Sequence, residues 1–581
     1  MSYKTLLNTL DSLRKEAPKS FKRYHPKESN AEQLNQARAK AFAHLFLKVR
    51  FGVLHFADRQ ALICDGTQDG GVDAYYIDED NRTIYLIQSK FRTSEKNFEE
   101  KSIEVSELLK MEVGRISKGE PQDSNGQPFS ARITDLQKKI NNTRNIALYD
   151  WKVVLLANLH KVNDEQLKRL IDNMKYEVFN HSRTYRELVF PLTTGTYFKP
   201  NEIVITINLG HKSHPQLSQA VDTPLGPCNV RIIYVPIIEI ARITAKYKNS
   251  LLRYNPRNYL SLKKNEVNKS IRDTVLNTSQ NEFSLRNNGI TVLADYSSVT
   301  DRTGVSGEGQ LIIKDPQILN GGQTATTLAM ILEDEHAGSA VFGSKEVLLK
   351  IIEKPRNASD EGLMLFIETI SDATNMQSRI VEADRRANDP KMLQLQSHFF
   401  DNFGLFLERK RGEFQYGLDS KVISKKNVID RVSLLRAVTA YNGSPSKARS
   451  SEDKMFEEEQ FQRLLDNFDL AKITRAYFTL QAIEQMNSEK KQQQTLTITY
   501  GKYALLYATA LIGNDDESRS SPVETQAFLN VQRILNKWGS FEEHVRPLPS
   551  NAKYVLPDGF NFDGYYKGST VSDDVLNYEW T

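Results

Sequence analysis

Three polar residues in one short stretch, Asp73, Gln88 and Lys90, have types and spacing that suit phosphodiester hydrolysis. The runs 71–78 and 83–90 are rich in β-branched and aromatic residues and are separated by a polar, turn-forming segment, which predicts a β-hairpin. With a tight turn, Asp73 lies directly opposite Gln88. Because strand side chains alternate, Gln88 and Lys90 then share a face with Asp73.

Those three side chains can cooperate in metal-assisted chemistry. A carboxylate and an amide oxygen can hold Mg²⁺ or Mn²⁺, because these cations prefer oxygen ligands. A lysine can orient or deprotonate the attacking water and balance negative charge on the phosphate. The alternative is a surface hairpin with a salt-bridged lysine, but Asp and Lys that face inward on apolar strands need partners. Glycines in the approach, Gly66, Gly70 and Gly71, leave room for a nucleic acid backbone.

The run Gly-Gly-Val-Asp73 followed by Gln88-Ser-Lys90 resembles the PD-(D/E)XK nuclease signature in its Mrr-like form, in which glutamine replaces the second acid. The resemblance implies an α/β, restriction-endonuclease-like core of helix, three strands, helix and strand. It also implies that Asp73, Gln88 and Lys90 are catalytic, and that an acid of the leading helix helps Asp73 and Gln88 to hold the metal. Glu32 is the best placed acid, with Glu28 as an alternative. The following basic residues, Arg92 among them, suit phosphate contacts.

The surrounding pattern supplies the elements of this core. Asn30 can cap a helix that continues to about residue 50, and strand 151–158 and helix 164–174 follow the hairpin. The nuclease-like domain is therefore predicted over 30–230, with strand candidates 203–208 and 230–235 at its end. Residues 1–29 form a basic arm, read as a helix leading into a linker or as a solvated segment.

Amide-rich clusters mark an α+β central domain over 235–450. They lie beside apolar segments and are expected at the ends of elements, around a shared cleft. Asn320-Gly-Gly-Gln-Thr324 opens a helix, and a helix N-terminus favours anions, although turns and caps use the same residues. The candidate residues for binding a ligand or nucleic acid are Arg257, Arg286, Asn288, Asn320, Gln323, Thr324 and Asn375.

FSLRNNGITVLAD, KDPQILNGGQTATTL, ISDATNMQSRI and ERKRGEF resemble, in that order, the blocks of the AIPR family, named for abortive infection and phage resistance. The resemblance covers roughly residues 235–420. It implies a role in bacterial defence against phage or other foreign DNA, and nucleotide or nucleic-acid binding is the corresponding expectation for the central domain.

Composition excludes several other classes of protein. A net charge of +4 over 581 residues is too small for a protein that coats nucleic acid. Two cysteines cannot build a disulfide scaffold, which suits a cytoplasmic protein, and no apolar run is long enough to span a membrane. Residues 451–581 predict a mainly helical C-terminal region with an acidic tail that either packs on the body or recruits a partner.

Together these patterns predict a Mg²⁺-dependent endodeoxyribonuclease of a restriction or abortive-infection system. A duplex has two strands and each site cuts one, so a homodimer is expected. Self-protection requires either methylation of host DNA by a separate methyltransferase or an inactive resting state. The chain has no P-loop, so ATP-driven translocation would need a partner protein, and an ATPase or sensor partner encoded nearby is the corresponding expectation. The alternative is a nucleic-acid- or nucleotide-sensing module whose nuclease-like fold is inactive and which acts through partner proteins.

Overall fold

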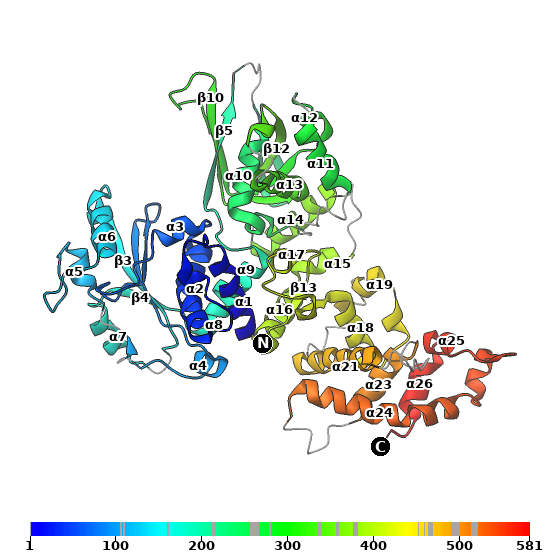
Figure 1. Cartoon of the computed structure of the whole chain (residues 1–581). Helices are drawn as coiled ribbons and strands as arrows, with labels where there is room; N and C mark the ends of the chain where they lie inside the picture. The colour runs from blue at the N-terminus through cyan, green and yellow to red at the C-terminus, as the bar shows by residue number, and fades with distance from the viewer. Residues whose placement is uncertain are drawn as a thin grey trace. The chain divides into compact units, whose positions relative to one another are not determined.

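The computed structural model forms two compact units (Figure 1). One comprises Met1–Thr374 with Gly412–Lys425, and the other comprises Asn375–Arg411 with Lys426–Thr581. Each unit is described by itself. The structure describes residues 2–104, 107–108, 111–159, 162–210, 216–255, 266–277, 280–334, 339–355, 359–375, 382–450, 452–457, 459, 461–462, 469–489, 500–512 and 521–580.

The first unit begins with two helices packed together, α1 (Ser2–Lys15) and α2 (Ala31–Phe51). Leu6 and Leu10 of α1 are completely buried, and Asp11 of α1 forms an ion pair with Arg38 of α2 at 2.6 Å. The interpretation of residues 1–29 as a solvated arm is therefore wrong. Counting charges missed the leucines at helical spacing, which bury one face of α1. The predicted Asn30 cap is confirmed, since its side chain accepts the Gln33 N–H at 3.0 Å.

A four-stranded sheet follows, in the order β1 (Ala74–Asp78), β2 (Thr83–Ser89), β3 (Asp150–Leu156) and β4 (Lys175–Val178). β1 and β2 form the predicted antiparallel hairpin in the predicted register, with Ala74 opposite Ile87. β2, β3 and β4 run parallel. An isolated antiparallel bridge between Ile63 and Ala74 precedes the hairpin. The hairpin end that carries Asp73 thus lies at one margin of a mixed sheet.

Helices cover both faces of this sheet. On one face, the Phe51 ring of α2 stacks on Tyr76 with ring centroids 4.1 Å apart. On the other face, α6 (Ala131–Asn142) buries Ile133 beside Leu86 of β2 in one apolar cluster. The remaining helices of this part are short: α3 (Phe56–Gln60), α4 (Glu95–Glu99), α5 (Val113–Ser117), α7 (Asp164–Leu170), α8 (His181–Arg183) and α9 (Phe190–Thr194).

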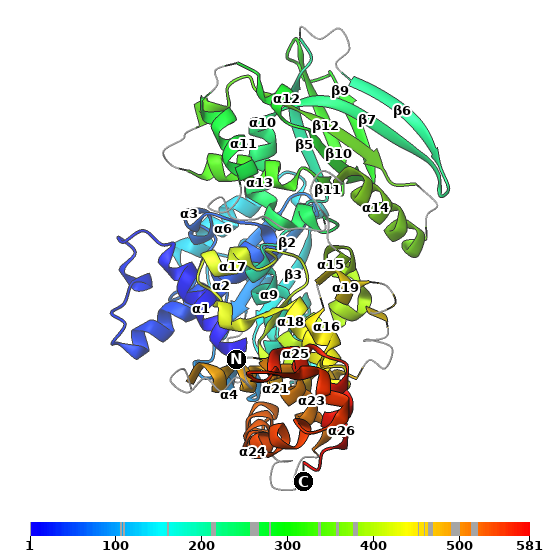
Figure 2. The same ribbon diagram turned by 90° about the vertical axis from the view of Figure 1, so that its right-hand side faces the viewer.

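Two more sheets follow the N-terminal sheet in the first unit. The three-stranded sheet has the order β5-β10-β9, and the five-stranded sheet has the order β11-β8-β12-β7-β6 (Figure 2). Their strands are β5 (Glu202–Asn208), β6 (Gln216–Thr223), β7 (Gly226–Pro236), β8 (Ile290–Ala294), β9 (Tyr296–Thr300), β10 (Glu308–Lys314), β11 (Gln317–Asn320) and β12 (Glu346–Glu353).

This pairing differs from the expected domain boundary. The strand candidates 203–208 and 230–235, which were expected to close the nuclease-like domain, pair instead with β10 and β12. Ile205 and Ile233 are buried in one core with Ile313 of β10. Partners more than 100 residues away in the sequence leave no local signal, so only the shared apolar core decides the pairing.

Helices lie on both faces of the five-stranded sheet. α10 (Ile237–Tyr247) and α13 (Gly322–Glu333) share the larger apolar core, whereas α14 (Asp360–Asn375) places Ile367 against Cys228 and Leu293 in a separate cluster. α11 (Glu266–Asn277), α12 (Phe283–Arg286) and α17 (Gln415–Asp419) complete the unit. The strands and helices together confirm a mixed α/β fold.

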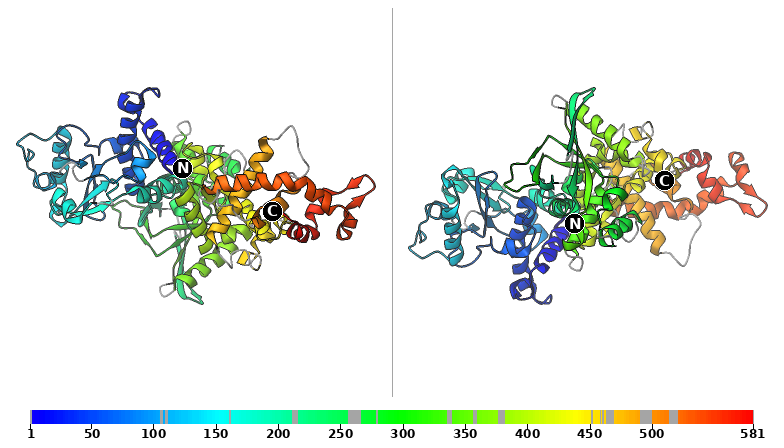
Figure 3. Two further views of the ribbon diagram at one scale, coloured as in Figure 1. Left: turned by 90° about the horizontal axis from the view of Figure 1, so that it is seen from below. Right: turned by 90° about the horizontal axis from the view of Figure 1, so that it is seen from above.

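The second unit is mainly helical, as predicted. Figures 1 and 3 show its helices, with α24 running beside α21. Its elements are α15 (Glu382–Arg385), α16 (Pro390–Phe403), β13 (Phe406–Glu408), β14 (Val428–Asp430), α18 (Arg431–Tyr441), α19 (Glu452–Phe456), α21 (Leu470–Glu489), α23 (Lys502–Leu511), α24 (Val523–Val545), β15 (Val555–Leu556), β16 (Gly559–Phe560), α25 (Phe562–Lys567) and α26 (Thr570–Asn577).

The acidic tail packs on this unit. Tyr566 donates a hydrogen bond to Glu542 of α24 at 2.7 Å, and Trp580 stacks on Trp538 with centroids 5.4 Å apart. Trp580 is only 4% exposed. Of the two alternatives for the tail, the described residues therefore favour packing on the body. Among the described residues, no helix combines the length and apolar character that a membrane crossing requires.

Candidate functional site

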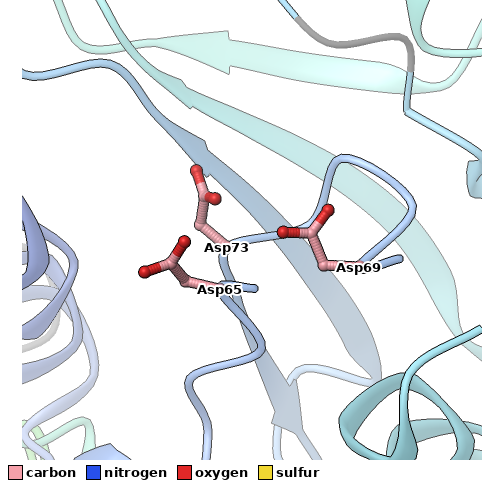
Figure 4. Close-up of side chains that lie close together, drawn as sticks. All are labelled: Asp65, Asp69 and Asp73. Carbon is pink, nitrogen blue, oxygen red and sulfur yellow. The ribbon is translucent and has the colours of Figure 1, made fainter. Parts of the chain in front are cut away.

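The loop before β1 gathers three carboxylates (Figure 4). The nearest side-chain oxygens of Asp65, Asp69 and Asp73 all lie within 4.8 Å of one another. The backbone closes the loop, because the N–H groups of Cys64 and Asp65 both donate to the Asp73 carbonyl, at 2.8 and 3.1 Å. A carboxylate cluster of this size matches the oxygen ligands that Mg²⁺ and Mn²⁺ prefer.

Asp69 organises the loop from inside. It is 7% exposed, and its two carboxylate oxygens accept the N–H groups of Gly66 at 3.1 Å and Gly71 at 2.9 Å. Gly70 and Gly71 have φ values of 63° and 73°, in the left-handed region that favours glycine. A Cβ on Gly70 would also meet Ile116 and Phe129 at 3.0 Å. These glycines therefore allow the sharp turn that brings the three aspartates together.

A cavity of about 280 Å³ opens beside Asp65 and Asp73. Its walls come from α2, from the Ile63 bridge and from the end of β2. The lining residues are Gln36, Ala39, Lys40, Ala43, Ile63, Asp65, Asp73 and Ser89. Lys40 of α2 forms an ion pair with Asp65. The cavity thus combines two acids, one cation and one amide with an apolar wall formed by Ala39, Ala43 and Ile63.

Asp73 is held in an environment that disfavours its charge. Its Oδ2 accepts the Ser89 N–H at 2.6 Å, which fixes its orientation. Burial raises the pKa of Asp73 to about 7, and the negative charges of Asp65 and Asp69 act in the same direction. The Ser89 hydrogen bond and the Lys90 charge lower the pKa without cancelling these effects. A cation beside Asp73 would relieve this unfavourable charge.

The raised pKa predicts a pH-dependent stability. The unfolded chain releases the Asp73 proton near pH 4, whereas the folded state holds it up to about pH 7. Stability therefore falls as the pH rises from about 4 to about 7, and the full cost is present above pH 7. In the presence of a chelator, Asp73→Asn is expected to raise the free energy of unfolding at pH 8 by about 1–3 kcal/mol, and by less at pH 5. Thermal unfolding at both pH values measures this. Equal effects at pH 5 and pH 8 would contradict it, and Asp135→Asn, at an exposed position, is the control.

The other predicted catalytic residues lie around this cavity in different ways. Gln88 is 1% exposed, and its Nε2 donates to the Gly71 carbonyl at 2.9 Å, so its amide supports the aspartate loop. Gln88 does not line the cavity. Lys90 is half-buried and close enough for its charge to lower the pKa of Asp73 and Asp69.

The other predicted residues of this site, Glu32, Arg92 and Glu28, lie outside the cavity lining. Glu32 is exposed in the first turn of α2 and does not line the cavity, whereas Gln36, one turn later, does. The Gln36 amide donates to Glu32 at 3.5 Å. Arg92 forms an ion pair with Glu107. Glu28 is exposed before the helix starts.

The sequence interpretation missed four residues of the site: Gln36, Lys40, Asp65 and Asp69. The sequence held a spacing signal for the two aspartates and another for Gln36 and Lys40. Asp65, Asp69 and Asp73 recur every four residues in a glycine-rich segment, and Gln36 and Lys40 follow Glu32 at helical spacing. Neither pattern shows that the loop and α2 meet, because that contact depends on the path of the segment 52–64 that joins them, which contains α3 and the Ile63 bridge.

In the centre of the first unit, the amide-rich clusters do come together. Asn268 donates to Gln323 at 3.2 Å, and Asn287 donates to Thr324 at 3.1 Å. Asn255 Nδ2 donates to the Leu319 carbonyl at 3.2 Å. These bonds tie the start of α13 to three segments far away in the sequence. The prediction that the clusters lie at the ends of elements is confirmed.

The remaining central candidates are spread over this region. Asn320 accepts the Gly321 N–H at 2.6 Å, Asn288 is exposed before β8, and Arg286 is exposed and paired with Glu282 at 2.6 Å. Asn375 ends α14, but its side chain lies outside the described part, and Arg257 lies outside the described residues. The shared cleft expected around these clusters therefore stays a prediction.

These features define a multi-part α/β and helical protein with a carboxylate-lined cavity beside its N-terminal sheet. The sequence profile of the family described as AIPR protein matches residues 252–553, more than half of the chain. The chain therefore belongs to the AIPR family, which indicates a role in phage defence or abortive infection. Comparison with curated proteins and with solved structures gave no match.

Proposed function

We propose that this protein is a metal-dependent DNA endonuclease of a phage-defence system. The observation that carries the proposal is the meeting of Asp65, Asp69 and Asp73 within 4.8 Å beside a cavity, with Lys90 close by. Three carboxylates held this close repel each other, so the arrangement favours a cation. A purely structural loop needs Asp69 alone, because Asp69 already accepts the loop amides.

The topology supports the same proposal. A leading helix, a bridge, an antiparallel hairpin and, after α6, a parallel strand follow one another in chain order. This is the order implied by the resemblance to PD-(D/E)XK nucleases of the Mrr-like form, with the Ile63 bridge in place of the first strand. Asp73 precedes β1 and Lys90 follows β2, so the two lie at the same end of the hairpin.

The donor set fits a hard divalent cation. Asp65 and Asp73 line the cavity, and Asp69 adds a third carboxylate behind them. Mg²⁺ or Mn²⁺ is therefore the expected ion, since both prefer carboxylate oxygens and keep several water ligands. Such an ion would stabilise negative charge on a scissile phosphate.

Each side chain of the site would then have its own role in hydrolysis. Asp73, oriented by the Ser89 N–H, would bind the cation, and Lys40 would hold Asp65 in place through their ion pair. The Lys90 ammonium would orient the attacking water and balance the charge that develops on the phosphate. Gln88 would act as a positioning residue, because its amide supports the Gly71 carbonyl.

Incubation of the purified full chain with supercoiled plasmid tests the proposal. We expect nicked and linear DNA with Mg²⁺ or Mn²⁺ and none with a chelator, since the charge on the phosphate then lacks its counter-ion. Single-stranded DNA and RNA of the same sequence show whether the activity is selective for duplex DNA. Tight binding of DNA or nucleotides without any metal-dependent cutting would contradict nuclease activity and favour a sensing module that acts through partner proteins.

A double-strand break needs two sites, so we propose that the active form is a homodimer. Protection of the host genome requires either methylation by a separate enzyme or a resting state released by an ATPase or sensor partner. Digestion of methylated and unmethylated plasmid separates these two routes. Equal cutting of both would exclude protection by methylation at the sites present in that plasmid.

A further inference from the structure

The five-stranded sheet of the first unit ends in β6 among the described residues. β6 (Gln216–Thr223) pairs with β7 on one side, and no strand among the described residues pairs with its other side. Figure 2 shows β6 as the outer strand of the long β6–β7 hairpin. Every residue from Gln216 to Asp222 is exposed. The strand contains neither lysine nor proline, the residues that commonly protect an edge from further pairing.

β6 also carries an exposed apolar row. Leu217 is 59% exposed and Val221 is 40% exposed, and alternation places both on the same face with Gln219 between them. Tyr234 of β7, 41% exposed, lies on that face too, because Ile232 pairs with Leu217. An open edge with an apolar row indicates a binding surface for another strand.

We propose that this edge pairs antiparallel with β6 of a second copy of the chain, about a two-fold axis at Gln219. Residues opposite each other in an antiparallel ladder belong to the same kind of pair, hydrogen-bonded or not. Neighbouring residues of a strand belong to different kinds. When two copies of the same edge pair antiparallel, the two-fold axis that relates them must therefore pass through a residue. It cannot pass between two neighbouring residues, because that would place residues of different kinds opposite each other.

That rule leaves few registers for the pairing of two β6 strands, and one of them places apolar side chains opposite each other. With the axis at Gln219, Leu217 lies opposite Val221 of the partner subunit, so apolar side chains meet on both sides of the axis. An axis at Ser218 would place Leu217 opposite a glutamine, and an axis at Ala220 would do the same to Val221. Cross-strand apolar pairs are the contacts that stabilise a sheet, so the register at Gln219 is selected.

The dimer rests on the chemistry of β6 and is independent of the carboxylate cavity. It supplies the second copy that the proposed cutting of both DNA strands requires. Its test measures assembly and not cleavage, so the two proposals can fail separately. A dimer that cuts no DNA would support this interface and contradict the nuclease.

A disulfide across the axis tests the register. In Gln219→Cys the two new cysteines face each other on the same side of the sheet, about 4.5–5.5 Å apart at Cβ. We expect copper phenanthroline to give a covalent dimer on a non-reducing gel, which a reductant reverses. Ser218→Cys is the matched control, because its cysteine lies on the other face opposite Ala220. The native cysteines, Cys64 and Cys228, are buried.

Charge exchange provides a second test in the full chain. In L217E/V221E a glutamate faces a glutamate twice, so sedimentation should show a monomer. In L217K/V221E each lysine faces a glutamate, so the dimer should return. A wild-type chain that stays monomeric at about 100 µM in sedimentation would overturn the proposal. Equal cross-linking of the two cysteine variants, or identical behaviour of the two charge variants, would overturn the register.

Discussion

Asp73→Ala is expected to lower metal-dependent plasmid cleavage by about 1,000-fold or more, because it removes a carboxylate that lines the cavity, belongs to the aspartate cluster and lies at the same end of the hairpin as Lys90. Asp65 and Asp69 cannot replace it, since Asp65 is paired with Lys40 and Asp69 with the loop amides. Cleavage rates over a series of Mg²⁺ concentrations measure the loss. Excess metal should restore little activity.

Lys90→Ala should reduce the same rate by about 100-fold or more while leaving metal binding nearly intact, because a lysine stabilises charge and does not ligate the cation. Asp135→Ala and Lys138→Ala on α6 serve as matched controls, since both side chains are more than half exposed and pair with each other at 3.8 Å. Circular dichroism checks that every variant folds. Unchanged cutting by Asp73→Ala and Lys90→Ala would place the chemistry elsewhere in the chain.

The largest effect on stability is expected in the second unit, at the ion pair between Arg431 and Asp384. Their side chains are 4% and 0% exposed, and Arg431 Nη2 lies 2.6 Å from Asp384 Oδ1. Arg431 also donates to the carbonyls of Ala383 at 3.1 Å and Arg409 at 2.6 Å. Asp384→Ala would leave a buried guanidinium without its main counter-charge, which costs about 3–5 kcal/mol.

Chemical denaturation of the full chain, followed by the fluorescence of Trp538 and Trp580 in the same unit, measures this loss. Glu484→Ala is the control, because its pair with Lys502 is exposed and is worth about 1 kcal/mol or less. The double variant D384L/R431M removes both charges and keeps most of the volume, so it should be more stable than Asp384→Ala alone. An Asp384→Ala variant as stable as Glu484→Ala would contradict this prediction.

Local sequence patterns were sufficient for elements whose partners are close in the chain. The β1–β2 hairpin has the predicted register because its turn is short, and a short turn leaves few ways to align two strands. The Asn30 cap follows from the side chain alone. The amide-rich clusters fall at the ends of elements because amides and glycines suit turns and helix starts.

Predictions from charge and from the order of elements along the chain failed where segments distant in sequence pack together. Residues 1–29 were judged by their charge, but the leucines of α1 bury that segment on α2. β5 and β7 were assigned to the preceding domain, but their partners are β10 and β12. Apolar burial favours such pairings over nearer ones, and it depends on faces that form only when the chain folds.

The candidate site divides in the same way. The sequence by itself determined that Asp73 and Lys90 stand at one end of a hairpin, that the chain carries the AIPR blocks, and that its C-terminal part is helical. Only the tertiary structure decided which groups surround Asp73. It placed Asp65 and Asp69 beside Asp73, directed the Gln88 amide to Gly71, and brought Gln36 and Lys40 from α2 to the cavity. The reason is geometric, because a few ångströms between side chains decide what a site can bind, and packing alone sets those distances.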